Sequence, residues 1–404
     1  MTDLALESGI SWKGSMSVGV QCGCPRYGRE VVVLTGKTVV ICIDGFDPEY
    51  LESCETPVLR ELGRKGFLVT GRCMMPSVTN VNNVSLVTGS YPEAHGIGSN
   101  YRLVRETEEE VYMESGQDIQ AQTIFQRAKA IGVGSILVTA KDKLRTLLGN
   151  HATVAVSSER PPGYLVNEVG EPPEIYSLEV NGWVIGAASH LLSRSEPEAG
   201  VVYIATTDYA MHTYAPEQPE SQRHMSILDD AIGGLVEAHP DATLLVTADH
   251  GMSAKSRMVD LKAALARYGI AANPVPIIKD RYVVHHSNLG GCAYVYLEST
   301  GPDAAARALD VLKGTDGVEE ALSRDDAAAS FRLPYDRIGD IVVTGEPDVV
   351  FGDPSQVEMP ARLRSHASVH EREIPIIGYN GDFEGFSFEE NRDVGRYVLE
   401  RGLG

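Results

Sequence analysis

The 404-residue sequence contains no long apolar segment and no targeting segment at its start. A membrane-spanning helix needs about 20 consecutive apolar residues, and no stretch of this sequence reaches even about 18. Residues 1–14 lack the basic start and the apolar stretch of a secretory signal. We therefore expect a cytoplasmic protein with no membrane anchor.

The chain has far fewer basic than acidic residues. The chain has 35 Lys and Arg against 56 Asp and Glu, which gives a formal net charge of -21. An acidic surface repels nucleic acid and anionic membranes, so we expect neither as a partner. It also repels a phosphorylated substrate, so a small anionic substrate would need bound cations or well-placed lysines to reverse the local field.

Cysteine is scarce too, and its spacing predicts no disulfide framework. Only six cysteines occur in the chain. Cys22 and Cys24 stand too close for a usual zinc pair and have no second pair, while Cys42 lies inside an apolar run that is typical of a buried thiol. These features fit a reducing compartment. The 43% apolar content allows a large core without cross-links.

What the sequence does have is a series of short apolar, β-branched runs that end at polar residues. These runs cover residues 38–43, 135–138, 201–205 and 243–246. Runs of this kind are typical of buried strands in a parallel sheet. Helical patterns lie between or beside them, at residues 56–66, 122–130 and 224–239. The alternation predicts an α/β fold with a doubly wound, mixed sheet flanked by helices, in which ligands bind beyond the carboxyl ends of the strands.

The pattern changes after about residue 270, where short strand-like segments replace the alternation of strand and helix. We expect strands at residues 282–284, 293–296, 331–333 and 339–344, and one helix over 303–313. This pattern predicts an inserted α+β cap domain over residues 270–352. The catalytic core would then comprise residues 31–269 and 353–404, with residues 1–30 as an N-terminal extension.

A dispersed set of acidic and histidine residues carries the strongest chemical signal. Most of its members directly follow the predicted strands; the set is Asp44, Asp208, His212, Asp249, His250 and His366. Carboxylate and imidazole are ligands that suit Zn²⁺. Asp208 and His212 are four apart and would share one face of a helical turn. Each residue alone would be interpreted as a helix cap or a core histidine, but their joint occurrence favours a metal site.

A hydroxyl-rich segment offers a nucleophile. The pattern predicts a helix over residues 81–88 that opens at Thr79 or Asn80. A hydroxyl at a helix N-terminus lies among backbone N–H groups, where a metal ion can activate it. Thr79 could also be only a cap. Ser77 and Ser85 are rival hydroxyls, although Ser85 falls in the middle of the helix and should face away.

The order of these motifs resembles that of the alkaline phosphatase superfamily, in its nucleotide pyrophosphatase/phosphodiesterase branch. The matching motifs are Asp44-Gly, Pro-x-x-Thr79, Val-Thr-Gly-x-Tyr-Pro-x-x-His-Gly-Ile, Asp208-x-x-x-His212, Asp249-His-Gly-Met and Ser-His366. Within that branch the sequence is similar to the phosphonoacetate hydrolases, over about residues 39–379. The resemblance implies an alkaline phosphatase-like fold and hydrolysis of the C–P bond of phosphonoacetate through a phosphothreonine at Thr79.

The resemblance also implies two Zn²⁺ ions per chain. One zinc site would comprise Asp208, His212 and His366, and the other Asp44, Asp249 and His250. Asn100 matches an asparagine that binds a phosphoryl oxygen in this branch. The sequence departs from the branch where Asn-Val-Asn, in place of Phe-Pro-Asn, follows Thr79. It departs again after His366, where His370 follows closely; His366 is favoured as the last ligand because Arg-Ser-His keeps the usual context.

Three further residues are candidates for substrate binding. Lys141 and Lys143 follow a predicted strand, and side chains two apart in an extended segment point to the same side, where they could hold one carboxylate. A lysine pair is similarly placed in the phosphonoacetate hydrolases. His286 in the predicted cap could contact the substrate as well. A solvated loop and a polar turn are the plain alternatives for these residues.

Other functions stay open at this level. A nucleotide pyrophosphatase or phosphodiesterase would need an aromatic slot for a base, and only 8 phenylalanines occur. A relative of cofactor-independent phosphoglycerate mutase would prefer a serine nucleophile and manganese. A metal-binding scaffold without catalytic activity would not require the hydroxyl of Thr79. Asp/His sites also accept manganese or iron. The sequence does not determine the oligomeric state and allows a homodimer.

Overall fold

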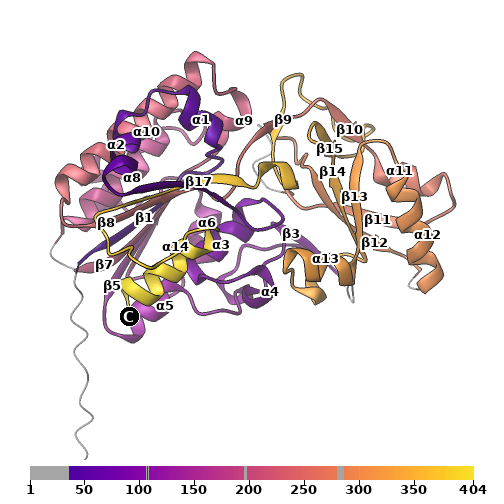
Figure 1. Ribbon diagram of the computed structural model, residues 1–404, viewed down its shortest axis with the longest axis horizontal. Helices are drawn as coiled ribbons and strands as arrows, with labels where there is room; N and C mark the ends of the chain where they lie inside the picture. Colours follow the sequence, from indigo (N-terminus) through magenta and orange to yellow (C-terminus); the bar gives the residue numbers. More distant parts are fainter. Residues whose placement is uncertain (1–35, 106, 108, 195–197, 280–285, 300) are drawn as a thin grey trace, which may run out of the picture. The chain divides into compact units, whose positions relative to one another are not determined.

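The computed structural model describes residues 36–404 except positions 106, 108, 195–197, 280–285 and 300. Its main feature is a seven-stranded sheet (Figure 1). In spatial order its strands are β2 (Phe67–Arg72), β17 (Glu373–Tyr379), β8 (Thr243–Thr247), β1 (Thr38–Cys42), β7 (Ala199–Ala205), β5 (Gly134–Thr139) and β6 (Val154–Ser157). The strands from β8 to β6 are parallel, whereas β17 is antiparallel to both β2 and β8. The predicted mixed α/β sheet is confirmed.

The register of this sheet brings the ends of its parallel strands level. Cys42 pairs with Ala205 on one side and with Thr247 on the other, and Thr139 pairs with Ala205. These central strands consist of apolar and β-branched residues that are almost wholly buried, as both faces are covered. The polar residues that follow each strand therefore meet at one edge.

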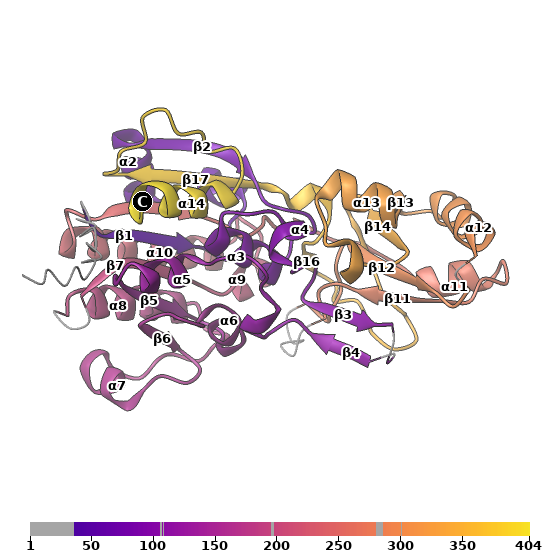
Figure 2. The same cartoon turned by 90° about the horizontal axis from the view of Figure 1, so that it is seen from below.

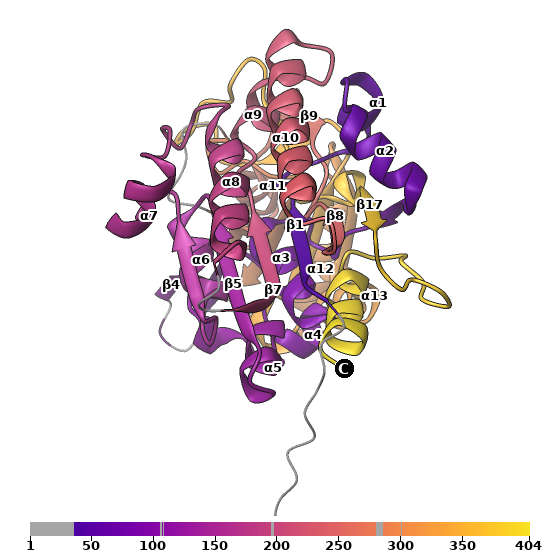
Figure 3. The same cartoon turned by 90° about the vertical axis from the view of Figure 1, so that its left-hand side faces the viewer.

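Helices cover both faces of the sheet (Figures 1 and 3). One face carries α2 (Pro57–Lys65), α8 (Val180–Leu192) and α10 (Pro219–Ala238), and the other carries α3 (Thr79–Thr88), α5 (Ile124–Ala130), α6 (Asp142–Leu148) and α14 (Arg392–Tyr397). Shorter helices are α1 (Pro48–Ser53), α4 (Pro92–His95), α7 (Gly163–Val169) and α9 (Tyr209–Thr213). The predicted helices are present, and α10 begins earlier than expected because Pro219 occupies its first turn, where proline is tolerated.

A second sheet lies in the later part of the chain (Figure 2). Its four antiparallel strands, in spatial order, are β11 (Ala272–Pro276), β12 (Cys292–Leu297), β14 (Ile341–Gly345) and β13 (Val318–Ser323). It packs with α11 (Leu261–Ala266) and α12 (Pro302–Lys313) around an apolar cluster of its own. Smaller pairings join β3 (Tyr101–Val104) to β4 (Glu109–Tyr112), β9 (Ser253–Ala254) to β16 (Arg364–Ser365), and β10 (Arg257–Val259) to β15 (Val349–Phe351).

Most of the elements expected in this region are present. The strands expected at 293–296 and 339–344 correspond to β12 and β14, and the expected helix to α12. The strand expected at 331–333 is wrong: these residues end α13 (Arg324–Phe331), where Arg332 adopts the left-handed conformation with φ 55°. Residues 282–284 and 1–30 lie outside the described residues. The described residues all belong to one compact unit, and the cap boundaries stay a prediction.

The described residues bear on two further expectations. No helix among them is both long enough and apolar enough to cross a bilayer. Cys42, Cys54, Cys73 and Cys292 are free and buried, as expected for Cys42. Cys22 and Cys24 are not among the described residues.

Candidate metal centre and active site

Three aspartates meet at the carboxyl edge of the main sheet. Asp44 follows β1, Asp249 follows β8, and Asp208 follows β7 and is the N-cap residue of α9. All three are buried, with at most 2% exposure. The parallel register of β7, β1 and β8 is the reason that residues 164 and 41 positions apart along the chain become neighbours.

Three histidines complete the cluster, and each presents the same nitrogen to it. Their Nδ1 atoms lie close to main-chain carbonyl oxygens: His212 to that of Arg364 at 2.7 Å, His366 to that of Ser77 at 2.7 Å, and His250 to that of Gly251 at 2.9 Å. A carbonyl can only accept, so each Nδ1 must carry a proton. In the neutral form of such a ring, the Nε2 lone pair is the one that faces the carboxylates. This is the tautomer in which a histidine can bind a metal ion through Nε2.

The candidate ligand atoms fall into two overlapping groups. Asp208, His212 and His366 form one, and Asp44, Asp208 and His250 form the other, with all atoms of each group within 4.8 Å of one another. His212 Nε2 lies 2.8 Å from Asp208 Oδ2, and His250 Nε2 lies 3.5 Å from Asp44 Oδ1. Asp249, which the resemblance places with Asp44 and His250, stands beside the second group, with Oδ2 3.7 Å from His250 Nε2.

The donor set fits divalent cations. Burial, followed by the neighbouring carboxylates, raises the pKa of Asp44 well above its usual range and that of Asp249 to about 7. Burial lowers the pKa of His250 and His366, which keeps these rings neutral. Asp44 Oδ1 is buried and has no hydrogen-bond partner among the described residues. Oxygen and imidazole donors arranged in this way are a set that Zn²⁺ accepts.

The structure separates the two late histidines. His366 is buried within the cluster, with its ring stacked on that of His250 at a centroid separation of 3.6 Å. His370 lies apart, with Nε2 2.6 Å from the Glu319 carboxylate and the pair partly exposed. The geometry therefore favours His366 as the member of the ligand set.

The hydroxyl of Thr79 lies next to these candidate ligands. Thr79 is the first residue of α3 and is 3% exposed, with Oγ1 3.4 Å from His250 Nε2. The rival hydroxyls have other partners: Ser77 Oγ donates to the Ser368 carbonyl at 2.7 Å, and Ser85 Oγ lies 2.8 Å from His95 Nε2. Of the three candidate hydroxyls, Thr79 is the one beside the histidine cluster.

Asn100 is fixed against the same helix end. Its side-chain Oδ1 accepts the Asn80 N–H at 3.1 Å, and its own main chain is held by Ile277 and Met113. Because the oxygen is the atom that accepts from the helix, the NH₂ end of the Asn100 amide is the end left for other acceptors. This orientation suits a side chain that donates to an anion.

The two lysines are arranged differently from the expectation. They do not lie in one extended segment: Lys141 is extended, but it is the N-cap residue of α6, and Lys143 belongs to the first turn of that helix. The two-residue period of a strand, on which the prediction depended, therefore does not apply. Both are buried, and Lys141 Nζ lies 2.8 Å from Asp208 Oδ1 and 3.4 Å from Asp44 Oδ2.

His286 approaches the cluster from the later part of the chain. It is 3% exposed, and its ring centroid lies 5.2 Å from that of His212. Its Nδ1 accepts the Asn288 N–H at 2.9 Å, so in the neutral ring the proton sits on Nε2. His286 thus has the opposite tautomer to the three clustered histidines and is suited to donate rather than to ligate.

Two neighbouring residues were missed by the sequence analysis. Asn83 of α3 donates from Nδ2 to the Thr79 carbonyl at 3.0 Å and to Asp249 Oδ2 at 3.1 Å, and Tyr203 of β7 donates its hydroxyl to Asn83 Oδ1 at 2.8 Å. A weak signal existed, because asparagine is a poor helix former and Asn83 lies inside a predicted helix. Nothing in the sequence indicated its partners.

A family model described as type I phosphodiesterase / nucleotide pyrophosphatase matches residues 38–369. The chain belongs to this family. In sequence and structure it is similar to phosphonoacetate hydrolase from Sinorhizobium meliloti 1021, which has been solved with phosphonoformate and with phosphonoacetate. Identity is 32% and the TM-score 0.82, and the match covers 91% of this chain and 96% of that chain. The predicted membership of this branch of the superfamily is confirmed.

More distant relatives share the fold or part of the chain. Murine ectonucleotide pyrophosphatase / phosphodiesterase 5 has 17% identity and a TM-score of 0.67, with 91% of this chain and 95% of that chain covered. Venom phosphodiesterase from Naja atra is 26% identical over 237 residues, which are 54% of this chain and 26% of that relative. A Bos taurus bis(5'-adenosyl)-triphosphatase is 26% identical over 260 residues, 54% of its length. The chain thus spans about half or less of these curated relatives.

Proposed function

We propose that the protein hydrolyses the C–P bond of phosphonoacetate to acetate and phosphate, through a phosphothreonine at Thr79. The observation that carries the proposal is the position of the Thr79 hydroxyl, 3.4 Å from His250 Nε2 at the edge of a buried Asp/His cluster. The similarity to a phosphonoacetate hydrolase solved with phosphonoacetate supports this substrate over others.

The side chains around Thr79 supply substrate binding. The Asn100 amide and the main-chain N–H of Thr79, at the first position of α3, would donate to phosphonate oxygens. Lys141, Lys143 and the Nε2–H of His286 would hold the carboxylate end. Lys141 pairs with Asp208 and Asp44 in the structure, so the proposal requires its ammonium to change partner when a carboxylate binds.

The reaction then needs two displacements at phosphorus. Thr79 Oγ forms a bond to phosphorus and releases its proton to solvent, while the P–C bond breaks and its electron pair leaves on the CH₂ group. The lysines stabilise this carbanion as an enolate because they hold its carboxylate, and a solvent proton completes acetate. Water next displaces Thr79 from phosphorus, which gives phosphate and restores the hydroxyl.

The ligand set would hold two zinc ions. Its residues are Asp208, His212 and His366 for one, and Asp44, Asp249 and His250 for the other. When bound, such ions supply Lewis-acid stabilisation of the phosphonate oxygens and lower the pKa of a nearby hydroxyl. Manganese or iron could occupy the same donors.

The decisive experiment measures phosphate release from phosphonoacetate by the purified protein, with and without a chelator. We expect release that depends on bound metal. Thr79→Ala should abolish turnover while metal analysis still finds about two zinc ions per chain, since the threonine is not in the ligand set. Turnover by Thr79→Ala at the wild-type rate would exclude the phosphothreonine.

A nucleotide pyrophosphatase or phosphodiesterase is the second candidate, favoured by the family match and by the curated relatives. A nitrophenyl nucleotide ester distinguishes the two functions. If this ester turns over well and phosphonoacetate does not, the carboxylate-binding role of the lysines is wrong. The cytoplasmic location, the absence of nucleic-acid and membrane partners, and a homodimer stay predictions.

A further inference from the structure

Asn83 joins the candidate nucleophile to a candidate ligand through a single amide. One turn after Thr79 on α3, its NH₂ group donates to the Thr79 carbonyl at 3.0 Å and to Asp249 Oδ2 at 3.1 Å. Asn83 is 1% exposed, so water does not compete for these bonds. The other Asp249 oxygen, Oδ1, accepts the Gly45 and His250 N–H groups. Both oxygens of Asp249 are therefore held in place.

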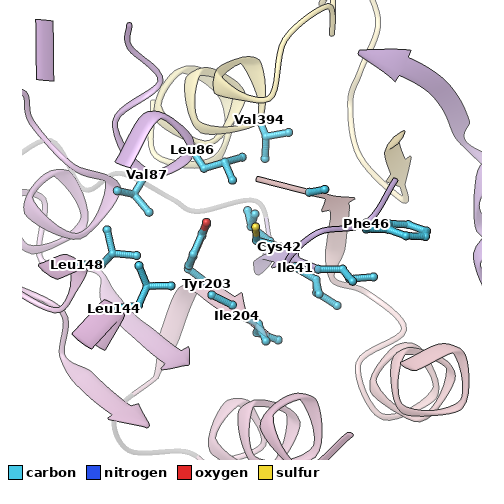
Figure 4. Close-up of a cluster of buried hydrophobic side chains, with 14 of the residues drawn as sticks. Ile41, Cys42, Phe46, Leu86, Val87, Leu144, Leu148, Tyr203, Ile204 and Val394 are labelled. Carbon is cyan, nitrogen blue, oxygen red and sulfur yellow. The ribbon is translucent and has the colours of Figure 1, made fainter. Parts of the chain in front are cut away.

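Tyr203 determines which way this amide faces. Its hydroxyl donates to Asn83 Oδ1 at 2.8 Å, and its ring is wholly buried. Figure 4 shows the Tyr203 oxygen pointing away from β7 toward the side on which Leu86 and Val87 of α3 lie. A flipped amide would place its oxygen against the Thr79 carbonyl and the Asp249 carboxylate, where three acceptors would meet without a proton. Only one orientation satisfies all partners.

The other asparagines of α3 have different partners. Asn82 bonds to the Met74, Pro76 and Val78 main chain before the helix, and Asn80 donates to the Met113 carbonyl. These contacts fix loops. The side-chain bonds of Asn83 instead run from the residue that carries the hydroxyl to a member of the ligand set.

We propose that Asn83 is a positioning residue that fixes the Thr79 hydroxyl and the Asp249 carboxylate relative to each other. Tyr203 keeps the Asn83 amide in the orientation that this role requires. The inference depends on the proposed function for the role of Thr79, but the effect on Asp249 can be measured without substrate. Residues that orient metal ligands typically change metal affinity or activity by about 10- to 100-fold when they are replaced.

The test compares Asn83→Leu and Tyr203→Phe with a matched control, Ser85→Ala. Ser85 lies on the same helix and is fully buried, but its hydroxyl pairs with His95. Zinc affinity of the full chain is measured by competition with a chromogenic chelator, alongside thermal stability and the kcat and KM for phosphonoacetate. Asn83→Leu should weaken one of the two zinc sites by about 10- to 100-fold. Tyr203→Phe, which loses a single hydrogen bond, should weaken it by about 3- to 10-fold.

The kinetic readout separates positioning from folding. Asn83→Leu should lower kcat and leave KM within about twofold, because its amide faces Thr79 and Asp249. Ser85→Ala should lower only thermal stability. If Asn83→Leu and Tyr203→Phe lower only thermal stability, as Ser85→Ala does, and leave the zinc affinity unchanged, the proposal is wrong. If Asn83→Leu fails to fold, the zinc affinity of Tyr203→Phe alone decides. If the wild-type protein binds zinc but does not hydrolyse phosphonoacetate, the proposed substrate is wrong. The zinc affinities of the variants still decide the role of Asn83.

Discussion

A buried ion pair holds the segment that carries His366. Glu371 and Lys255 have fully buried side chains and approach to 2.7 Å. The second Glu371 oxygen accepts the main-chain N–H of Ser368 at 2.9 Å and its hydroxyl at 2.7 Å, and Ser253 donates to the first. The carboxylate thus closes the turn just after His366. We predict that Glu371→Gln loosens this turn and destabilises the protein.

The size of the effect follows from what the change leaves behind. An amide accepts with only one of its ends, so its NH₂ group must face either Lys255 or Ser368, and one buried donor then faces another. In both orientations the ammonium loses its charged partner, while it keeps the Pro347 carbonyl at 2.8 Å. Removing one partner of a buried pair typically costs about 3–5 kcal/mol. The control Glu319→Gln breaks the partly exposed pair with His370, which should cost below about 1 kcal/mol.

The penalty should also depend on pH. Burial alone would raise the pKa of Glu371, but Lys255 and the hydrogen bonds from Ser253 and Ser368 outweigh burial and hold the pKa below its usual value. A lowered folded-state pKa gives stability that is complete above the unfolded value, about 4.3, and is lost as the pH falls through the folded value. The penalty of Glu371→Gln should therefore be full at pH 7 and shrink below about pH 4.

Urea unfolding of wild type, Glu371→Gln and Glu319→Gln, followed by circular dichroism at several pH values, measures these differences. A chelator must be present, because bound metal adds stability of its own. If Glu371→Gln costs no more than Glu319→Gln at pH 7, the buried carboxylate does not support the fold as reasoned here. A penalty that grows on acidification would contradict the sign of the pKa change.

The remaining predictions concern the ligands and the lysines. His366→Ala should lower the zinc content measured by metal analysis from about two ions per chain. His370→Ala should leave the zinc content unchanged, because the His370 ring pairs with Glu319. Equal losses of zinc in both variants would contradict the choice of His366 as the ligand. Lys141→Ala should mainly raise KM for carboxylated phosphonates in a steady-state assay, since it removes a carboxylate partner, and an unchanged KM would exclude that role.

Much of the site could be anticipated because the sheet is parallel. Short buried runs predicted β1, β7 and β8, and the residues after parallel strands must meet at one edge. That rule alone placed Asp44, Asp208 and Asp249 together. The helix that begins at Thr79 was predicted for a similarly local reason, namely its apolar pattern and the glycine that ends it.

Local patterns failed where a neighbour in the chain decided the conformation. Lys141 and Lys143 were interpreted as one extended segment, but α6 begins between them and alters the direction of the second side chain. The strand expected at residues 331–333 is the end of a helix instead. In both places two or three residues carry too little periodicity to tell a strand from a helix end.

The sequence by itself determined the sheet, the order of the strand-end candidate ligands and the family. Only the tertiary structure decided which atoms face the centre. His212, His250 and His366 expose Nε2 because carbonyls of Arg364, Gly251 and Ser77 accept from Nδ1, and two of those carbonyls come from distant parts of the chain. The Asn83 amide is likewise oriented by Tyr203, 120 positions away. A hydrogen bond between remote segments depends on how the layers pack, and that packing leaves no periodic trace in the sequence.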